Sequence, residues 1–139
     1  YIYTSEKVGP ISDIDLTRRV PPYKNVVNAA LFSAIYMGFS EIYLVGVDMT
    51  GFVTIFDENE GIDYGGHFYD DETKDEKSYM DSLHQDRSNE FMLKAYGTVF
   101  EIFRHTHDYA TRHGIKIYNA TKGGTLDVFP RVKYEELFA

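Results

Sequence analysis

Two side chains in this sequence have the clearest capacity for chemistry, the carboxylate of Asp48 and the imidazole of His67. Asp48 ends the apolar run IYLVGVD at 42–48, and His67 lies in the glycine-bearing sequence GGHFY at 65–69. A carboxylate at the carboxyl end of a strand in an open α/β sheet borders the crevice where ligands bind. An imidazole can accept the proton of a hydroxyl group at neutral pH. Asp48 is therefore a candidate for contact with a ligand, and His67 is a candidate general base.

Each of these residues also has a purely structural interpretation. Asp48 would cap the turn that follows the strand, and His67 would hydrogen-bond only to loop backbone. His84 lies in the same interval before the next helix, so it is the second candidate for the base. The other histidines belong to a predicted helix and receive no catalytic role: His105, His107 and His113.

A second polar group follows another predicted strand, at 115–118. The sequence NATKGG at 119–124 is a polar turn whose glycines allow backbone amides to approach a ligand closely. The amide of Asn119 can both donate and accept hydrogen bonds. Asn119 and Thr121 are therefore predicted to bind substrate, and a simple β-turn is the alternative.

The elements that position these residues follow from the apolar pattern. Nearly every position of 41–47 is apolar, without alternation, as in a parallel strand covered by helices on both faces. A helix precedes this strand, with Asn25 as its amino-terminal cap and Gly38 as its stop.

A long helix, roughly 88–113, separates this strand from the one at 115–118, and it carries one apolar stripe. The stripe consists of Met92, Tyr96, Val99, Phe100, Phe103 and Ala110. A helix between two strands favours a right-handed parallel crossover. The sequence therefore predicts a single α/β domain over 1–139, a Rossmann-like three-layer sandwich with a mainly parallel central sheet.

Residues 49–87 differ from the rest of the chain. They are acidic and contain several glycines, and only 52–56 is strand-like. A loop of this length inside a compact domain is usually functional or partly helical. The segment predicts a lid-like insertion over the site, and a disordered surface insertion is the alternative.

The composition excludes several classes of protein. The net charge is -8, and nonspecific nucleic-acid binding requires clustered basic residues instead. Because the chain has no cysteine, it has no disulfides, no thiolate nucleophile and no cysteine-based zinc site.

The start of the sequence predicts a piece of a longer protein, because it begins at Tyr1 with residues that already read as a strand. No stretch reaches the roughly 20 apolar residues that span a bilayer, and no signal peptide opens the sequence. We expect a soluble cytoplasmic domain, with any contact to the inner face of the membrane made by regions outside it. The sequence assigns no oligomeric state.

Two charged pairs precede the first helix. Asp13 and Asp15 form the DxD pattern by which many sugar-nucleotide enzymes hold a divalent ion on a diphosphate. The sequence has 22 acidic residues, so the pattern also arises by chance, and no metal or cofactor is assigned. Arg18 and Arg19 are the only adjacent basic pair.

Three segments together resemble a group of bacterial and archaeal proteins: 25–48, HFYDD at 67–71, and 114–138. The first is similar to the helix-then-strand signature of bacterial sialyltransferases that use CMP-activated sialic acid. It equally resembles the motility accessory factor group of flagellin glycosyltransferases, and proteins similar to 6-hydroxymethylpterin diphosphokinases.

The resemblance implies roles for several residues. Sialyltransferases of this kind place a histidine base between the Asp-ending strand and the next helix, which favours His67. They place an arginine ahead of the preceding helix to meet the donor's phosphate or carboxylate, and Arg19 is the nearest match. Their tyrosines soon after Gly-x-Asp are not reproduced here. Tyr64 and Tyr69 would substitute if the insertion folds back. The turn at 119–124 would lie near the nucleotide.

Three functions are compatible with these residues. The first is transfer of a sialic-acid-type sugar from a CMP donor to a glycan or protein acceptor, without a metal because a CMP-sugar has a single phosphate. The second is a pterin diphosphokinase, in which Asp13, Asp15 and Asp48 would bind Mg²⁺ with ATP. The third is a noncatalytic nucleotide-binding module of a polysaccharide locus.

Overall fold

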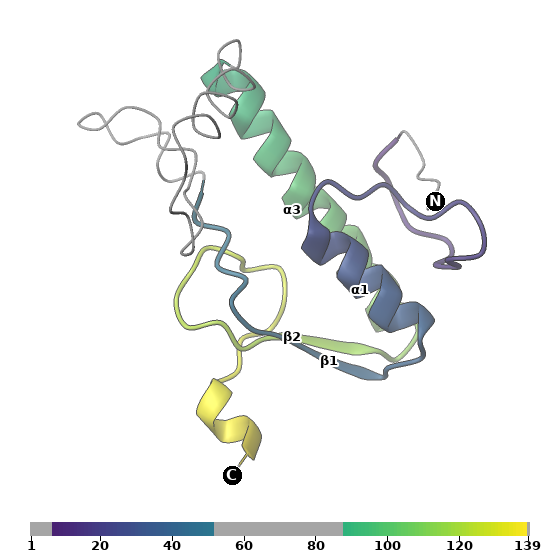
Figure 1. The fold of residues 1–139 in the computed structure, drawn as a ribbon, viewed down its shortest axis with the longest axis vertical. Helices are drawn as coiled ribbons and strands as arrows, with labels where there is room; N and C mark the ends of the chain where they lie inside the picture. The colour runs from purple at the N-terminus through teal and green to yellow at the C-terminus, as the bar shows by residue number, and fades with distance from the viewer. Residues whose placement is uncertain (1–6, 52–87, 139) are drawn as a thin grey trace, which may run out of the picture. The chain divides into compact units, whose positions relative to one another are not determined.

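A computed structural model describes residues 7–51 and 88–138 of the chain. Its elements are helix α1 (Val26–Tyr36), strand β1 (Glu41–Leu44), helix α3 (Asn89–Arg112), strand β2 (Lys116–Asn119) and the 3-10 helix η2 (Tyr134–Phe138) (Figure 1). The chain divides into two compact units, one formed by Tyr1–Met49 with Gly97–Ala139 and the other by Thr50–Tyr96. Helix α1, both strands and the part of α3 from Gly97 onward belong to the first unit.

Helix α1 begins and ends at the residues that the sequence predicts. Asn25 is extended, and its side-chain oxygen accepts the Asn28 N–H at 2.9 Å, which satisfies one unpaired donor of the first turn. Gly38 follows the helix with φ +86°, and its N–H donates to the Ile35 carbonyl at 3.0 Å. This left-handed glycine ends the helix without steric cost. The predicted cap and stop are both confirmed.

Strands β1 and β2 pair in parallel, from Glu41 opposite Lys116 to Leu44 opposite Asn119. The predicted parallel arrangement of these strands is therefore confirmed. Strand β1 is shorter than the predicted 41–47, because Gly46 has φ +73° and breaks the extended geometry. The last pairing bond runs from the Ala120 N–H to the Leu44 carbonyl, at 2.8 Å.

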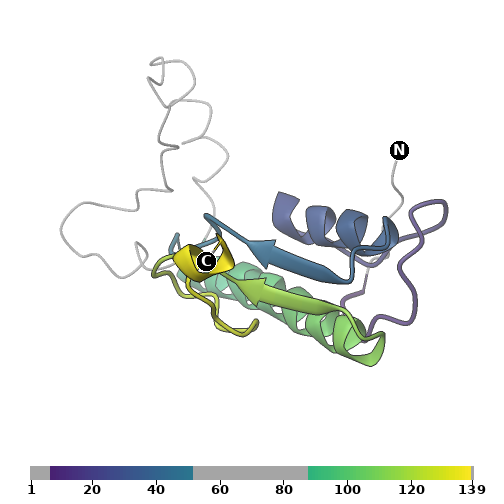
Figure 2. The ribbon, with the colours of Figure 1, turned by 90° about the horizontal axis from the view of Figure 1, so that it is seen from below.

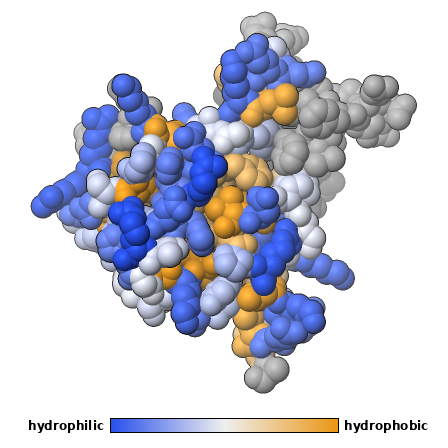
Figure 3. Space-filling model, turned by 180° about the vertical axis from the view of Figure 1, so that it is seen from behind, coloured by the Kyte–Doolittle hydropathy of each residue, from blue (hydrophilic) through white to orange (hydrophobic). Residues whose placement is uncertain are grey.

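Helices α1 and α3 lie on the same side of the two strands (Figures 1 and 2). The core between them and the sheet contains Leu31, Phe32, Ile35, Leu44, Val99, Ile102, Phe103, Tyr109, Ala110, Ile117, Leu126 and Phe129. Hydrophobic residues that reach the surface lie in patches among hydrophilic ones on the face seen in Figure 3. In the described ranges, neither helix has both the length and the apolar character that crossing a membrane requires.

The opposite face of the sheet is partly exposed in the described part of the chain. Tyr43 and Tyr118 stack on it with ring centroids 5.3 Å apart, and Tyr43 and Val45 are 40% and 57% exposed. Among the described residues no helix covers this face (Figure 2). The described part is thus a mixed α/β structure with a parallel strand pair and helices on one side.

Candidate functional site

The segment after β2 is bonded to the segment after β1 at the carboxyl ends of the two strands. The Val47 N–H donates to the Thr121 hydroxyl oxygen at 3.0 Å. The Thr125 N–H donates to the Asp48 carbonyl at 2.7 Å, and the Thr125 hydroxyl donates to the Met49 carbonyl at 2.6 Å. Asp48 and the predicted substrate-binding residue Thr121 therefore lie at the same edge of the sheet.

Gly124 lies directly against the backbone of Asp48. A Cβ atom at this position would be 2.6 Å from both the Cα and the carbonyl oxygen of Asp48. Gly124 also has φ +78°, a conformation that side chains rarely adopt. Only glycine fits here, and its approach fixes the distance between the loop and the strand end.

The amide of Asn119 holds this loop from beneath. Asn119 is fully buried. Its oxygen accepts the Thr121 N–H at 3.0 Å, and its nitrogen donates to the Leu126 carbonyl at 2.9 Å. Both polar atoms of the side chain are therefore engaged with the loop, so Asn119 positions it, and its predicted contact with substrate stays a prediction.

Arg131 is a residue of this site that the sequence reasoning missed. Its guanidinium donates to four loop carbonyls, at 2.6–3.3 Å. These carbonyls belong to Thr121, Gly123, Gly124 and Leu126. A guanidinium presents five N–H donors in a rigid fork, which suits a ring of carbonyls. The signal available in the sequence was a single arginine shortly after a glycine pair.

Replacing Arg131 with methionine should destabilise the chain by about 1–3 kcal/mol, because four loop carbonyls lose their hydrogen bonds to the guanidinium. The loss stays in this range because Arg131 is exposed and water can replace part of these bonds. Arg131→Lys should restore little of this, since an ammonium group cannot reach a ring of carbonyls as a planar fork does. Urea unfolding measures the change. Lys133→Met, which removes an exposed cation paired with Glu136, is the control and should change stability by less than about 0.5 kcal/mol. Equal effects of Arg131→Met and Lys133→Met would contradict the role of Arg131.

Asp48 itself is exposed, so a ligand can reach this strand end. The next residue, Met49, has φ +55°, which is uncommon for a residue with a side chain and is often found at functional sites. The Asn25 side-chain nitrogen contacts the Met49 sulfur at 3.8 Å. This contact brings the first turn of α1 to the same edge as Asp48.

The described contacts do not assign the remaining predicted site residues to this cluster. Arg19 is exposed in the segment ahead of α1, and the contacts that define the cluster do not include it. His67, Tyr64 and Tyr69 lie outside the described residues, as do His84 and most of the 49–87 insertion. Their predicted roles stay predictions.

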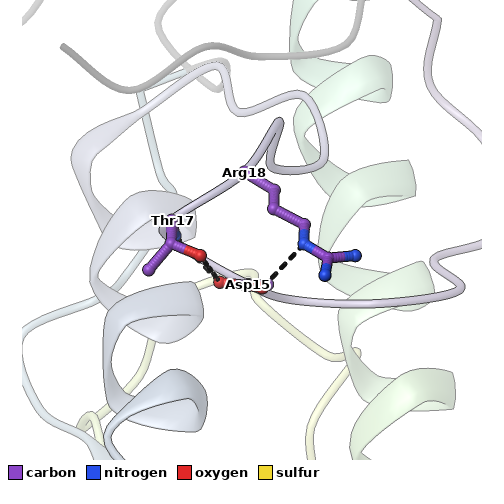
Figure 4. A network of polar contacts seen from close by, with 3 residues as sticks. All are labelled: Asp15, Thr17 and Arg18. Carbon is purple, nitrogen blue, oxygen red and sulfur yellow. Dashed lines mark hydrogen bonds and ion pairs between the residues drawn. The ribbon is translucent and has the colours of Figure 1, made fainter.

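Asp15, from the DxD pattern, is engaged in a local turn (Figure 4). One carboxylate oxygen accepts the Thr17 N–H at 2.9 Å and the Thr17 hydroxyl at 2.6 Å, and the other lies 3.3 Å from Arg18 Nε. These interactions lower the pKa of Asp15, and the hydrogen bond from the Thr17 hydroxyl contributes most to the shift. Within 7–51 and 88–138, no group of three or more histidine and acidic side chains is placed to hold a metal ion.

Thr17→Val should raise the pKa of Asp15 toward its ordinary value, because it removes the hydroxyl that contributes most to the shift. A lowered folded-state pKa means that this turn stabilises the chain at neutral pH, and that the contribution is lost as pH falls through the folded-state pKa. Carbon-detected NMR titration of the Asp15 carboxyl measures the shift. Arg18→Met removes a smaller contribution, so a larger rise in that variant than in Thr17→Val would contradict the assignment.

The described geometry thus joins an exposed carboxylate, Asp48, to a glycine-bearing loop, 121–125, at one edge of a parallel strand pair. Asn119 and Arg131 hold that loop from within. In comparisons with known proteins, no family model, no curated protein and no solved structure matches this chain.

Proposed function

We propose that this chain is the CMP-sugar-binding α/β domain of a glycosyltransferase that moves a sialic-acid-type sugar to a surface glycan or glycoprotein. One observation carries the proposal: Asp48 and the loop 121–125 meet at the carboxyl ends of parallel strands, the edge where such folds bind ligands. The resemblance that the sequence of 25–48 suggests, to sialyltransferases that use CMP-sialic acid, is the reason for proposing this nucleotide. With an acceptor of this class, the proposed sugar transfer takes place near the cytoplasmic face of the membrane.

The chemistry of the edge suits a nucleoside monophosphate. The exposed carboxylate of Asp48 can accept hydrogen bonds from ribose hydroxyls. The hydroxyl of Thr121 accepts from the Val47 N–H, which leaves its own proton to donate. A CMP-sugar offers both kinds of partner, hydroxyl groups and phosphate oxygens.

The fuller fold belongs to the same proposal. A Rossmann-like three-layer sandwich requires further elements on the face that carries Tyr43 and Tyr118. The exposure of Tyr43 and Val45 supports such a cover, because parallel strands are ordinarily buried on both faces.

Calorimetric titration of the chain with CMP and with ATP, each with and without Mg²⁺, tests the proposed nucleotide. CMP should bind without Mg²⁺, and Asp48→Asn should weaken it by about tenfold, the loss expected for one hydrogen bond to a charged group. Asp127→Asn, at an exposed acid of the following loop, is the control and should leave CMP binding unchanged. Preference for ATP with Mg²⁺ would favour the diphosphokinase instead, and CMP binding without sugar transfer by the full-length protein would favour a noncatalytic module.

A further inference from the structure

The first turn of α1 carries backbone donors that lack acceptors. Every helix leaves its first N–H groups without intrahelical partners. Here Asn25 accepts from Asn28 through its side chain and from Ala29 through its carbonyl. In the described part of the chain the N–H groups of Val26 and Val27 have no acceptor. The turn therefore presents two N–H groups that a bound acceptor could take.

A buried side-chain donor lies in the same turn. Asn28 is 0% exposed, and its side-chain oxygen accepts the Lys24 N–H at 3.3 Å. That bond places the side-chain oxygen of Asn28 beside Lys24, just ahead of the cap, so the carboxamide lies at the amino-terminal end of the helix. Among the residues that the structure describes, the buried side-chain nitrogen of Asn28 has no hydrogen-bond partner. Buried amide donors are nearly always paired, so an unpaired one indicates a missing acceptor.

The electrostatics of this turn favour an anion. The amino-terminal end of a helix carries a partial positive charge, and a chain often offsets it with an acid in the first turn. Helix α1 has no acid there, although acids outnumber bases in the sequence by 22 to 14. Lys24 is exposed just ahead of the cap. The positive end of α1 therefore lacks a compensating charge of its own.

We propose that the first turn of α1 binds the phosphate group of the nucleotide, with the Asn28 side-chain nitrogen and the N–H groups of Val26 and Val27 as donors. This inference rests on the proposed function and adds to it the place of the phosphate. The contact between Asn25 and Met49 puts the turn beside Asp48, so one nucleotide can reach both. Asp48 then accepts from the ribose, and α1 holds the phosphate.

Asn28→Asp is the sharpest variant, because it keeps the oxygen that accepts from Lys24 and replaces the unpaired donor with an acceptor. The titrants are CMP, cytidine and inorganic phosphate. We expect the native chain to bind CMP more tightly than cytidine. Asn28→Asp should abolish that difference, with a loss of about tenfold or more for CMP and no change for cytidine. Ala30→Asp adds the same charge at an exposed position of α1 and is the matched control.

A second measurement does not depend on how the variant folds. In the native chain, CMP or inorganic phosphate should shift the side-chain amide resonances of Asn28 and the backbone resonances of Val26 and Val27. If CMP binds, but these signals do not shift and Asn28→Asp binds CMP as tightly as the native chain, the phosphate site is wrong while the proposed function stands. If phosphate shifts them and CMP binds no more tightly than phosphate, the anion site stands and the CMP assignment is wrong. Failure of both titrants to shift them overturns the inference.

Discussion

Gly124→Ala is expected to destabilise the chain by about 2–5 kcal/mol. The added Cβ would meet the backbone of Asp48 at 2.6 Å, and backbone atoms cannot rotate away as the end of a side chain can. The left-handed φ of +78° adds about 1–2 kcal/mol for any residue with a side chain, and forcing atoms into a filled space adds about 1–3 kcal/mol. Urea unfolding followed by circular dichroism measures the sum.

The neighbouring glycine separates the two causes. Gly123 has φ +73°, but a Cβ there would meet no atom within 4 Å. Gly123→Ala should therefore cost only the conformational part, about 1–2 kcal/mol. Equal losses for the two variants would mean that the loop does not press on Asp48 in solution.

His67→Ala is expected to reduce sugar transfer by the full-length protein by about 10²- to 10⁴-fold, the usual cost of losing a well-placed general base. The affinity for CMP should stay close to that of the native protein, because the role proposed for His67 is to act on the acceptor hydroxyl and not on the nucleotide. Steady-state transfer rates and CMP titration measure the two quantities.

His84→Ala is the control for this prediction, since His84 is the other histidine in the same interval of the sequence. Its transfer rate should remain near the native rate. Loss confined to His84→Ala would move the role to His84. A native rate in His67→Ala would remove the general-base assignment from His67.

The ends of the helices could be predicted from sequence because their signals are local. Asn25 caps α1 with its own side chain, and Gly38 and Gly114 adopt the left-handed conformation just after α1 and α3. These signals depend on backbone geometry within one turn. The parallel pairing of β1 and β2 followed because a helix separates the strands.

The strand length and the exposed face could not be predicted in the same way. The apolar run at 41–47 suggested one long buried strand, but Gly46 ends the pairing early. Periodicity reports where apolar residues lie and does not reveal which neighbours cover them. The exposed Tyr43 and Val45 are therefore a result of tertiary structure.

The candidate site was predicted in part. The sequence placed Asp48 and Asn119 at strand ends, and the parallel register brings those ends together. The roles of Asn119 and Arg131 in holding the loop could not be predicted, because both act through contacts with loop carbonyls that only the folded chain brings together. Asn28, at an ordinary helical position, gave no signal either, since its unpaired nitrogen is visible only once its burial is known.

Mapping the CMP site by amide resonances of the labelled chain tests the central claim most directly. Shifts at Asp48 and at Thr121, Gly124 and Thr125 are predicted, because these residues form the carboxyl edge of the strand pair. The amide resonances of Glu41 and Lys116, at the amino ends of the two strands, should remain unshifted. Shifts confined to those amino ends, or no shifts at saturating CMP, would contradict the account.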